Sequence, residues 1–137
     1  GAAKISEIKQ SLNYLSKNNV TVMHCVSAYP CNDEIVNLDR INSLKKISKN
    51  LGLSDHTHDI LSCLFSLSQG ITLIEKHFTI DNNLPGRDNK FAVLPHKFLE
   101  LKKNIDRYKL MTKKNTKTFI IQEKEIRKVY TGRWSKK

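Results

Sequence analysis

The sequence contains no run of eighteen consecutive apolar residues, so it offers no candidate for a membrane-spanning helix. Its first residues also lack the basic-then-apolar order of a secretion signal. The three cysteines, Cys25, Cys31 and Cys63, are an odd number without CxxC spacing, which argues against a disulfide framework and a zinc knuckle. These absences favour a cytoplasmic protein with reduced thiols and no membrane contact.

Acidic residues are scarce relative to basic ones, because 13 Asp and Glu stand against 24 Lys and Arg, a net charge of +11. Residues 96–137 hold 14 Lys and Arg but only 4 Asp and Glu, a balance of +10 that leaves +1 for residues 1–95. A nucleic-acid surface would interleave basic and aromatic residues on one folded face. The alternative is solvated charge on a terminal helix and tail, which fits this distribution better, so we expect no nucleic-acid partner.

The 137 residues suffice for one domain, and a hydrophobic content of 39% suffices for a core. Apolar residues at helical spacing predict helices over residues 4–19, 33–52, 58–70 and 94–111. Continuous apolar and β-branched runs predict buried strands over residues 20–30, 51–57 and 71–80. Gly52 and Gly70 stand where the second and third helices are expected to end.

Helices and strands alternate with short joins, which predicts an α/β fold with a parallel sheet and crossover helices. Three such strands could belong to a doubly wound sheet or to a TIM (β/α)8 barrel. Each strand ends in polar side chains at its carboxyl end, where parallel α/β folds place ligands and catalytic groups. Three successive strands that direct reactive groups toward one place favour the barrel.

His56 and His77 are 21 residues apart, the length of one helix plus one strand, so they occupy equivalent positions on neighbouring strands. Two neutral imidazoles placed in this way can converge on a divalent ion such as Mn2+, Zn2+ or Fe2+. A set of only two protein ligands leaves coordination positions open, as in a catalytic site. The alternative reading of the spacing is that each histidine is a satisfied polar residue at the barrel rim.

Three segments, HCVSAYP, LSDHT and IEKHFTIDNNLPGRD, closely resemble the sialic acid synthase family in sequence, order and spacing. Members condense phosphoenolpyruvate with an N-acylated hexosamine, such as N-acetylmannosamine, and release phosphate as they form nine-carbon 2-keto sugar acids. The resemblance covers residues 1–110 and implies the C-terminal part of a TIM (β/α)8 barrel, with residues 111–137 as a basic linker or tail. It also implies a transferase that uses Mn2+ or another divalent metal and is a homodimer in its complete form.

The resemblance assigns the metal and the catalytic roles by position. His56 and His77 match the two histidines that hold the family's manganese ion. His77 is also placed to contact substrate, and Tyr29 matches a tyrosine at the same ligand. We therefore expect His77 and Tyr29 to be catalytic residues.

The substrate-binding roles follow from the same resemblance. Ser54 matches a serine that helps to hold the phosphate of phosphoenolpyruvate, and Ser27 with Tyr29 matches polar residues at that ligand. Short hydroxyl groups suit the task because they donate to phosphate oxygens without filling the pocket. Asp88 matches an aspartate that contacts the amino-sugar. A carboxylate suits this place because it can accept hydrogen bonds from sugar hydroxyl groups. Without the family, LPGRD would be read as a Pro-Gly turn.

Two departures from the family pattern concern the rim of the pocket. The family usually has GPDH where this chain has GRDN at residues 86–89, which is expected to change the rim and with it the sugar accepted. After SDHT the family usually continues with Leu-Gly, but here His58 and Asp59 follow. We expect Asp59 to cap the next helix and His58 to face solvent rather than to be a third metal ligand.

A complete barrel needs about 250 residues, and three parallel strands leave two open edges. We therefore expect the chain to be a fragment, or one part that pairs with its other half, and to be inactive alone. A competing hypothesis is a catalytically inactive half-barrel or accessory protein that binds a partner through its basic C-terminal helix and tail. Another is a different divalent-metal aldolase, which would need a lysine or a third metal ligand at these strand ends. Lys76 is the only lysine candidate, although strand alternation directs it toward the helix layer.

Overall fold

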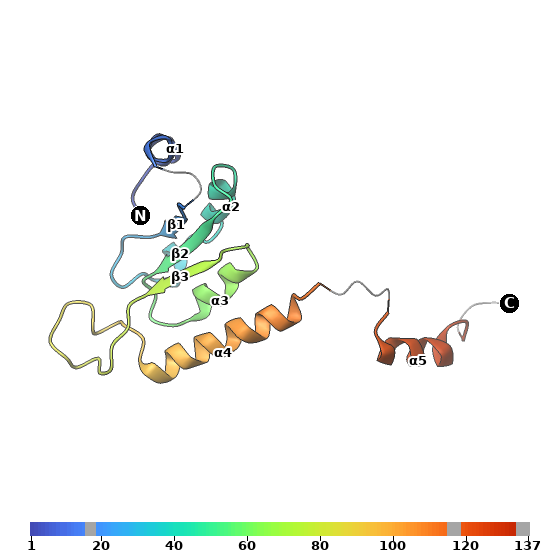
Figure 1. The fold of residues 1–137 in the computed structure, drawn as a ribbon. Helices are drawn as coiled ribbons and strands as arrows, with labels where there is room; N and C mark the ends of the chain where they lie inside the picture. The colour runs from blue at the N-terminus through green and yellow to red at the C-terminus, as the bar shows by residue number, and fades with distance from the viewer. Residues whose placement is uncertain (16–18, 115–118, 134–137) are drawn as a thin grey trace.

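The computed structural model describes residues 1–15, 19–114 and 119–133 (Figure 1). The elements in chain order are α1 (Ile5–Tyr14), β1 (Val22–Cys25), the 3-10 helix η1 (Asp33–Ile35), α2 (Arg40–Lys45), β2 (Leu51–Asp55), α3 (Leu61–Leu67), β3 (Leu73–Lys76), α4 (Pro95–Met111) and α5 (Ile121–Tyr130). The predicted helix over residues 4–19 thus ends earlier, and its positions 16–18 lie outside the described residues.

The three strands form one parallel sheet in the order β1-β2-β3, which confirms the predicted alternation of parallel strands with helices. Cys25 pairs with Ser54, and Ser54 pairs with Glu75, so the carboxyl ends of all three strands lie at one edge of the sheet. Within the described residues, β1 and β3 each pair on one side only. The carboxyl edge therefore collects the polar side chains that end each strand.

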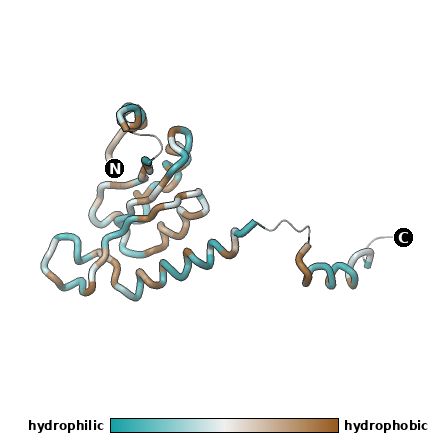
Figure 2. Tube along the Cα trace, viewed as in Figure 1, coloured by the Kyte–Doolittle hydropathy of each residue, from teal (hydrophilic) through white to brown (hydrophobic). Residues whose placement is uncertain are grey.

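The hydrophobic core lies between one face of the sheet and the helices. Its buried members are Val22, Ile41, Leu44, Leu51, Leu53, Ile60, Cys63, Ile71, Val93 and Leu101. The strand residues in this cluster alternate with residues on the opposite face, as the period of two in a strand requires. We call the side of the sheet that carries Val22, Leu51 and Leu53 the helix face, and the opposite side the interior face. Figure 2 shows apolar and hydrophilic stretches alternating along the strands and helices, with a further apolar stretch at the start of α5.

The second predicted helix is wrong in extent, because residues 33–52 contain η1, the short α2 and the start of β2, with irregular segments between them. Asn37 interrupts the helical backbone with a φ of 46°. Gly52 is not the end of a helix, as predicted, but lies inside β2 between Met23 and Leu73. A Cβ at Gly52 would lie 2.4 Å from Met23 Sδ and 2.9 Å from the Leu73 carbonyl oxygen, so close approach of the strands requires glycine there.

Other helix ends follow the predictions more closely. Gly70 has a φ of 78° and its amide donates to the Leu67 carbonyl 3.0 Å away, in agreement with its expected place after the third helix. The fourth helix, α4, begins at Pro95 and buries Leu101. Tyr108 fixes α4 to α3 by donating a hydrogen bond of 3.0 Å to the Leu67 carbonyl.

The last helix, α5, was not predicted. Its apolar side chains are exposed, and Figure 1 shows it far from the sheet, so they add nothing to the core. No helix in the described ranges is long and apolar enough to cross a bilayer.

Candidate functional site

A cavity of about 590 Å3 opens on the interior face at the carboxyl ends of the strands. It is lined by Gly1, Cys25, Ser27, Tyr29, Ser54, His56, Glu75, His77, Arg87 and Asp88. The six side chains singled out from the sequence, Ser27, Tyr29, Ser54, His56, His77 and Asp88, are all among them. The structure therefore brings these residues together, while the chemical role of each stays a prediction.

His56 and His77 extend from neighbouring strand ends, and their ring centroids lie 5.2 Å apart. His56 Nδ1 is 3.1 Å from the Val26 carbonyl oxygen. A carbonyl only accepts, so Nδ1 carries the proton and donates, and the lone pair of Nε2 stays available for a metal ion. Metal-binding histidines in proteins are commonly oriented by such a bond to a backbone carbonyl.

The donor set can be compared with what a divalent metal needs. Among the residues that the structure describes, no group of three or more His, Cys, Asp or Glu side chains could hold a metal ion. His56 and His77 are the two ligands expected from the sequence, and the carboxylates of Glu75 and Asp88 line the same cavity. Two neutral nitrogen donors with open positions for oxygen would suit Mn2+ and related ions in a catalytic role, and the expected metal stays a prediction.

The side chains around His77 come from the loop that follows β3. Asp88 Oδ2 lies 3.9 Å from His77 Nδ1, and both side chains are partly exposed. The Phe91 ring packs against the His77 ring at a centroid distance of 5.2 Å. The loop thus places the aspartate expected to contact sugar beside a histidine expected to bind metal.

Tyr29 lies over the histidine pair from the segment that follows β1. Its ring centroid is 4.3 Å from that of His56 and 6.3 Å from that of His77. The amide of Cys31 donates to the His56 carbonyl over 2.8 Å, which joins this segment to the end of β2. Tyr29 is therefore held close enough to both imidazoles to contact a ligand bound between them.

Glu75 is a cavity residue to which sequence reasoning gave no role. Its carboxylate accepts a hydrogen bond of 2.6 Å from the Ser54 hydroxyl on the adjacent strand. The signal was available, because Glu75 precedes His77 by two positions and side chains two apart on a strand share a face. Ser54 has only one hydroxyl proton, so in this structure that proton serves Glu75.

On the helix face, Lys76 is buried, as strand alternation predicted. Its Nζ lies 2.6 Å from Asp55 Oδ2 and donates to the Thr57 carbonyl over 2.7 Å. Both acceptors fix the ammonium group on the far side of the sheet from the cavity. This arrangement removes the lysine that the alternative aldolase would need, since a Schiff-base lysine must reach substrate.

His58 is exposed and does not line the cavity, as expected. The expectation for Asp59 was wrong in position, because the residue at the N-cap of α3 is Ile60. Asp59 Oδ1 instead accepts a hydrogen bond of 2.7 Å from the Ile60 amide and lies 3.5 Å from Lys97 Nζ on α4. It connects α4 to the segment that leads into α3.

Comparison with known proteins gives consistent matches. The NeuB family matches residues 1–117. The chain is 42% identical over 101 residues to the N,N'-diacetyllegionaminic acid synthase of Campylobacter jejuni, a match that covers 69% of this chain and 30% of the relative. It is 38% identical over 110 residues to the spore coat polysaccharide biosynthesis protein SpsE of Bacillus subtilis, which covers 76% of this chain and 29% of the relative.

Solved structures agree with the sequence matches. The N-acetylneuraminic acid (sialic acid) synthetase of Leptospira borgpetersenii, crystallised with citrate, superposes with a TM-score of 0.80 at 29% identity over 98% of this chain and 49% of its own. The solved structures that match this chain are TIM-barrel structures, which confirms that the three strands are part of such a barrel. The chain spans about a third of the length of the curated relatives described above.

Proposed function

Because the chain belongs to the NeuB family, we propose that it contributes the metal-binding side of the active site of a nonulosonic acid synthase. The relatives with assigned names are enzymes or proteins of carbohydrate biosynthesis. The proposed reaction is the condensation of phosphoenolpyruvate with an N-acylated hexosamine, such as N-acetylmannosamine, with release of phosphate.

One observation carries the proposal: His56 and His77 lie side by side at the carboxyl ends of neighbouring strands, in a cavity that also contains Ser27, Tyr29 and Asp88. The carboxyl ends of parallel strands are where TIM-barrel enzymes place their active sites. Hydroxyl groups suit a phosphate, a carboxylate suits sugar hydroxyls, and paired imidazoles suit a metal. The cavity therefore offers a complementary group for each part of the proposed reaction.

In the proposed reaction a bond forms between C3 of phosphoenolpyruvate and the aldehyde carbon of the open-chain sugar. Water then adds at C2, and phosphate leaves with cleavage of its C–O bond. Mn2+ held by His56 and His77 would supply a Lewis acid for the aldehyde oxygen. Asp88 accepts hydrogen bonds from the sugar hydroxyls and so orients the acceptor, while Tyr29 covers the reacting groups from the β1 side.

Ser27 and Ser54 are the proposed donors to the phosphate of phosphoenolpyruvate. Ser27 is exposed at the rim and can donate directly. Ser54 would have to turn its proton from Glu75 toward the phosphate, which makes Glu75 the group that determines whether this donor is available.

The test is phosphate release from phosphoenolpyruvate by the complete native protein that contains these residues, with N-acetylmannosamine as acceptor. His77→Ala should lower the metal-dependent rate by roughly 1,000-fold or more, because a catalytic cation contributes several kcal/mol to the transition state. His58→Ala is the matched control, since His58 is exposed outside the cavity and its loss should leave the rate unchanged. A His77→Ala protein with a near-normal rate would sink the assignment.

The second candidate is a catalytically inactive half-barrel that serves a partner. It is favoured by the two outer strand edges, which have no neighbour within the described residues. Binding of Mn2+ that depends on His56 and His77 separates the candidates, because a protein used only for interaction has no need to hold a metal.

A further inference from the structure

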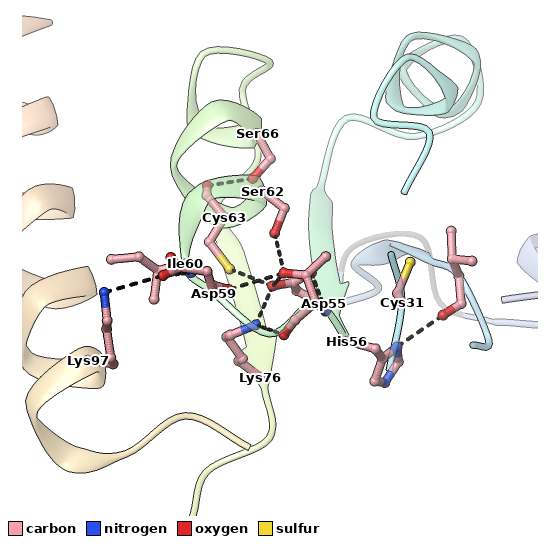
Figure 3. A network of polar contacts seen from close by, with 12 residues as sticks. Cys31, Asp55, His56, Asp59, Ile60, Ser62, Cys63, Ser66, Lys76 and Lys97 are labelled. Carbon is pink, nitrogen blue, oxygen red and sulfur yellow. Dashed lines mark hydrogen bonds and ion pairs between the residues drawn. The ribbon is translucent and has the colours of Figure 1, made fainter. Parts of the chain in front are cut away.

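Asp55 and Lys76 form an ion pair that is closed off from solvent on the helix face of the sheet. Lys76 Nζ lies 2.6 Å from Asp55 Oδ2, and the two side chains are 2% and 0% exposed. Figure 3 shows the pair beside α3, in a continuous network of polar contacts. Taking two charges out of water costs several kcal/mol, so a buried ion pair is weak support for fold stability. The pair therefore requires another explanation.

The contacts around Asp55 hold its carboxylate in one orientation. It accepts hydrogen bonds from the Thr57 amide at 3.1 Å, the Thr57 hydroxyl at 3.0 Å and the Cys63 thiol at 3.3 Å. These three donors and the Lys76 ammonium group together fix the Asp55 carboxylate, and Lys76 is held against it.

The position of the pair in the sheet relates it to the cavity. Asp55 and Lys76 are the last paired residues of the β2–β3 ladder, and each is followed at once by a histidine, His56 or His77. Successive side chains of a strand point to opposite faces, so the pair lies on the helix face and the imidazoles on the interior face. Both histidines therefore extend from the last cross-strand contact of the ladder.

Lys76 also binds on both sides of His56. Its ammonium group contacts Asp55, the residue before His56, and donates to the carbonyl of Thr57, the residue after it. Because Lys76 itself precedes His77, one side chain connects the backbone of His77 to both flanks of His56. Outside the strand ladder, the His56 carbonyl accepts from the Cys31 amide and the His77 carbonyl accepts from the Val93 amide, and neither bond connects the two histidines to each other.

We propose that Asp55 and Lys76 are positioning residues that fix the separation and orientation of His56 and His77 for one divalent cation. The role rests on the metal site proposed above. The pair touches neither the cation nor the substrate and acts through the backbone of β2 and β3. Groups that orient metal-binding histidines typically change metal affinity by about 10–100-fold when they are removed.

The test measures the affinity of the complete native protein for Mn2+, from the electron paramagnetic resonance signal of the free ion, and its thermal unfolding without metal. The main variant is the double substitution Asp55→Asn with Lys76→Met, which leaves no unpaired buried charge. We expect Mn2+ binding about 10–100-fold weaker, with metal-free unfolding close to that of the wild type. Lys97→Met is the matched control, because it removes an exposed lysine paired with Asp59 and Glu100, and its affinity should be unchanged.

A second variant keeps the experiment decisive if the double variant does not fold. Asp55→Asn with Lys76→Gln also leaves no unpaired buried charge but retains a side-chain amide that can donate to the Thr57 carbonyl, and we expect it to fold and to lose less affinity than the main double variant. Equal affinity in the wild type and the folded variants would overturn the positioning role and leave the metal site intact. Both proposals would be overturned if the wild-type protein bound no Mn2+, or if the His56→Ala variant bound Mn2+ as tightly as the wild type.

Discussion

Ser54 donates its hydroxyl proton to the Glu75 carboxylate across adjacent strands, at 2.6 Å, on the interior face of the sheet. A hydrogen bond to a charged group contributes about 1.5–3 kcal/mol, so the two side chains are expected to act as a unit. The interaction also competes with the donation from Ser54 to phosphate that the family resemblance implies.

Substitution of either partner should therefore disturb the same interaction. In the complete native protein we expect Ser54→Ala to lower kcat/KM for phosphoenolpyruvate by about 10-fold or more, because the phosphate loses a donor. Glu75→Gln should raise kcat/KM, because it weakens the acceptor that competes with phosphate for the Ser54 proton. The double variant should match Ser54→Ala, because Glu75 acts through Ser54. Ser68→Ala, on the exposed end of α3, is the control. Single effects that simply add in the double variant would mean that the two residues act separately.

The three cysteines should differ in alkylation by iodoacetamide. Cys31 and Cys63 are buried, and burial raises the pKa of the Cys63 thiol to about 12, with the Asp55 charge adding to the effect. Cys25 is half-buried, lines the cavity and lies 3.9 Å from His56 Nδ1. We expect mass spectrometry of the folded protein to find the label on Cys25 alone, and on all three cysteines after unfolding.

Ligands provide a second measurement at the same cysteine. Phosphoenolpyruvate with Mn2+ should slow the labelling of Cys25 by several-fold, because both are proposed to occupy the cavity that its thiol faces. Labelling at an unchanged rate in the presence of saturating ligand would place the ligand elsewhere.

His24 should make stability depend on pH near neutrality. It is buried in the helix face, its Nε2 donates to the Val36 carbonyl at 2.8 Å, and Nδ1 has no hydrogen-bond partner in the described part of the chain. Burial lowers the pKa of His24 below its usual value of 6.5, assisted by the nearby Arg40 charge and opposed by the bond to Val36. The unfolded chain therefore binds the proton more readily than the folded one.

It follows that the free energy of unfolding should fall as the pH drops below 6.5, toward the lower pKa of the folded state. Urea denaturation at several pH values between 5 and 8 measures the effect. This range lies above the pKa values of ordinary carboxylates, so their titration does not contribute to the slope. His24→Gln keeps a donor for Val36 and should flatten this dependence, whereas His58→Gln, at an exposed position, should not. The same slope in His24→Gln and the wild type would contradict the prediction.

Gly52→Ala should destabilise the sheet. The added Cβ would lie 2.9 Å from the Leu73 carbonyl oxygen and 2.4 Å from Met23 Sδ, and only the methionine side chain can move away without disturbing strand pairing. We expect a loss of about 1–3 kcal/mol, measured by chemical denaturation. Combining the change with Met23→Ala should cost less than the sum of the two single losses, because one of the two clashes is relieved. Full additivity would show that Met23 is not part of the obstacle.

The sequence was sufficient to predict the order of the elements, since each strand and helix carries its own period of apolar residues. The parallel sheet, the start of α4 at Pro95 and the family resemblance are confirmed. Extents were less accurate: the apolar run over residues 71–80 suggested a longer strand, but β3 ends at Lys76 and Phe78 makes only an isolated bridge to Val93. The apolar residues beyond the ladder, Phe78 and Ile80, are exposed, so the apolar run did not mark where strand pairing ends.

The cavity residues were found because they are reactive types at strand ends, and their motifs matched a family. The pairing of Asp55 with Lys76 was not predicted because it depends on the register between β2 and β3, which the pattern of one strand does not contain. The same limit applies to Gly52. Glycine is required there because the Leu73 carbonyl of the neighbouring strand leaves no room for a side chain.

The two outer strands have a practical consequence for handling the protein. The outward backbone groups of β1 and β3 have no strand partner in the described ranges, and Leu73 on β3 is half exposed. Unpaired strand edges with apolar side chains are templates for aggregation. Expression of residues 1–137 alone should therefore yield inclusion bodies or large oligomers in gel filtration. Coexpression with a polypeptide that supplies the remaining barrel strands should shift the same residues into the soluble fraction, because the arriving strands occupy both edges before other copies can.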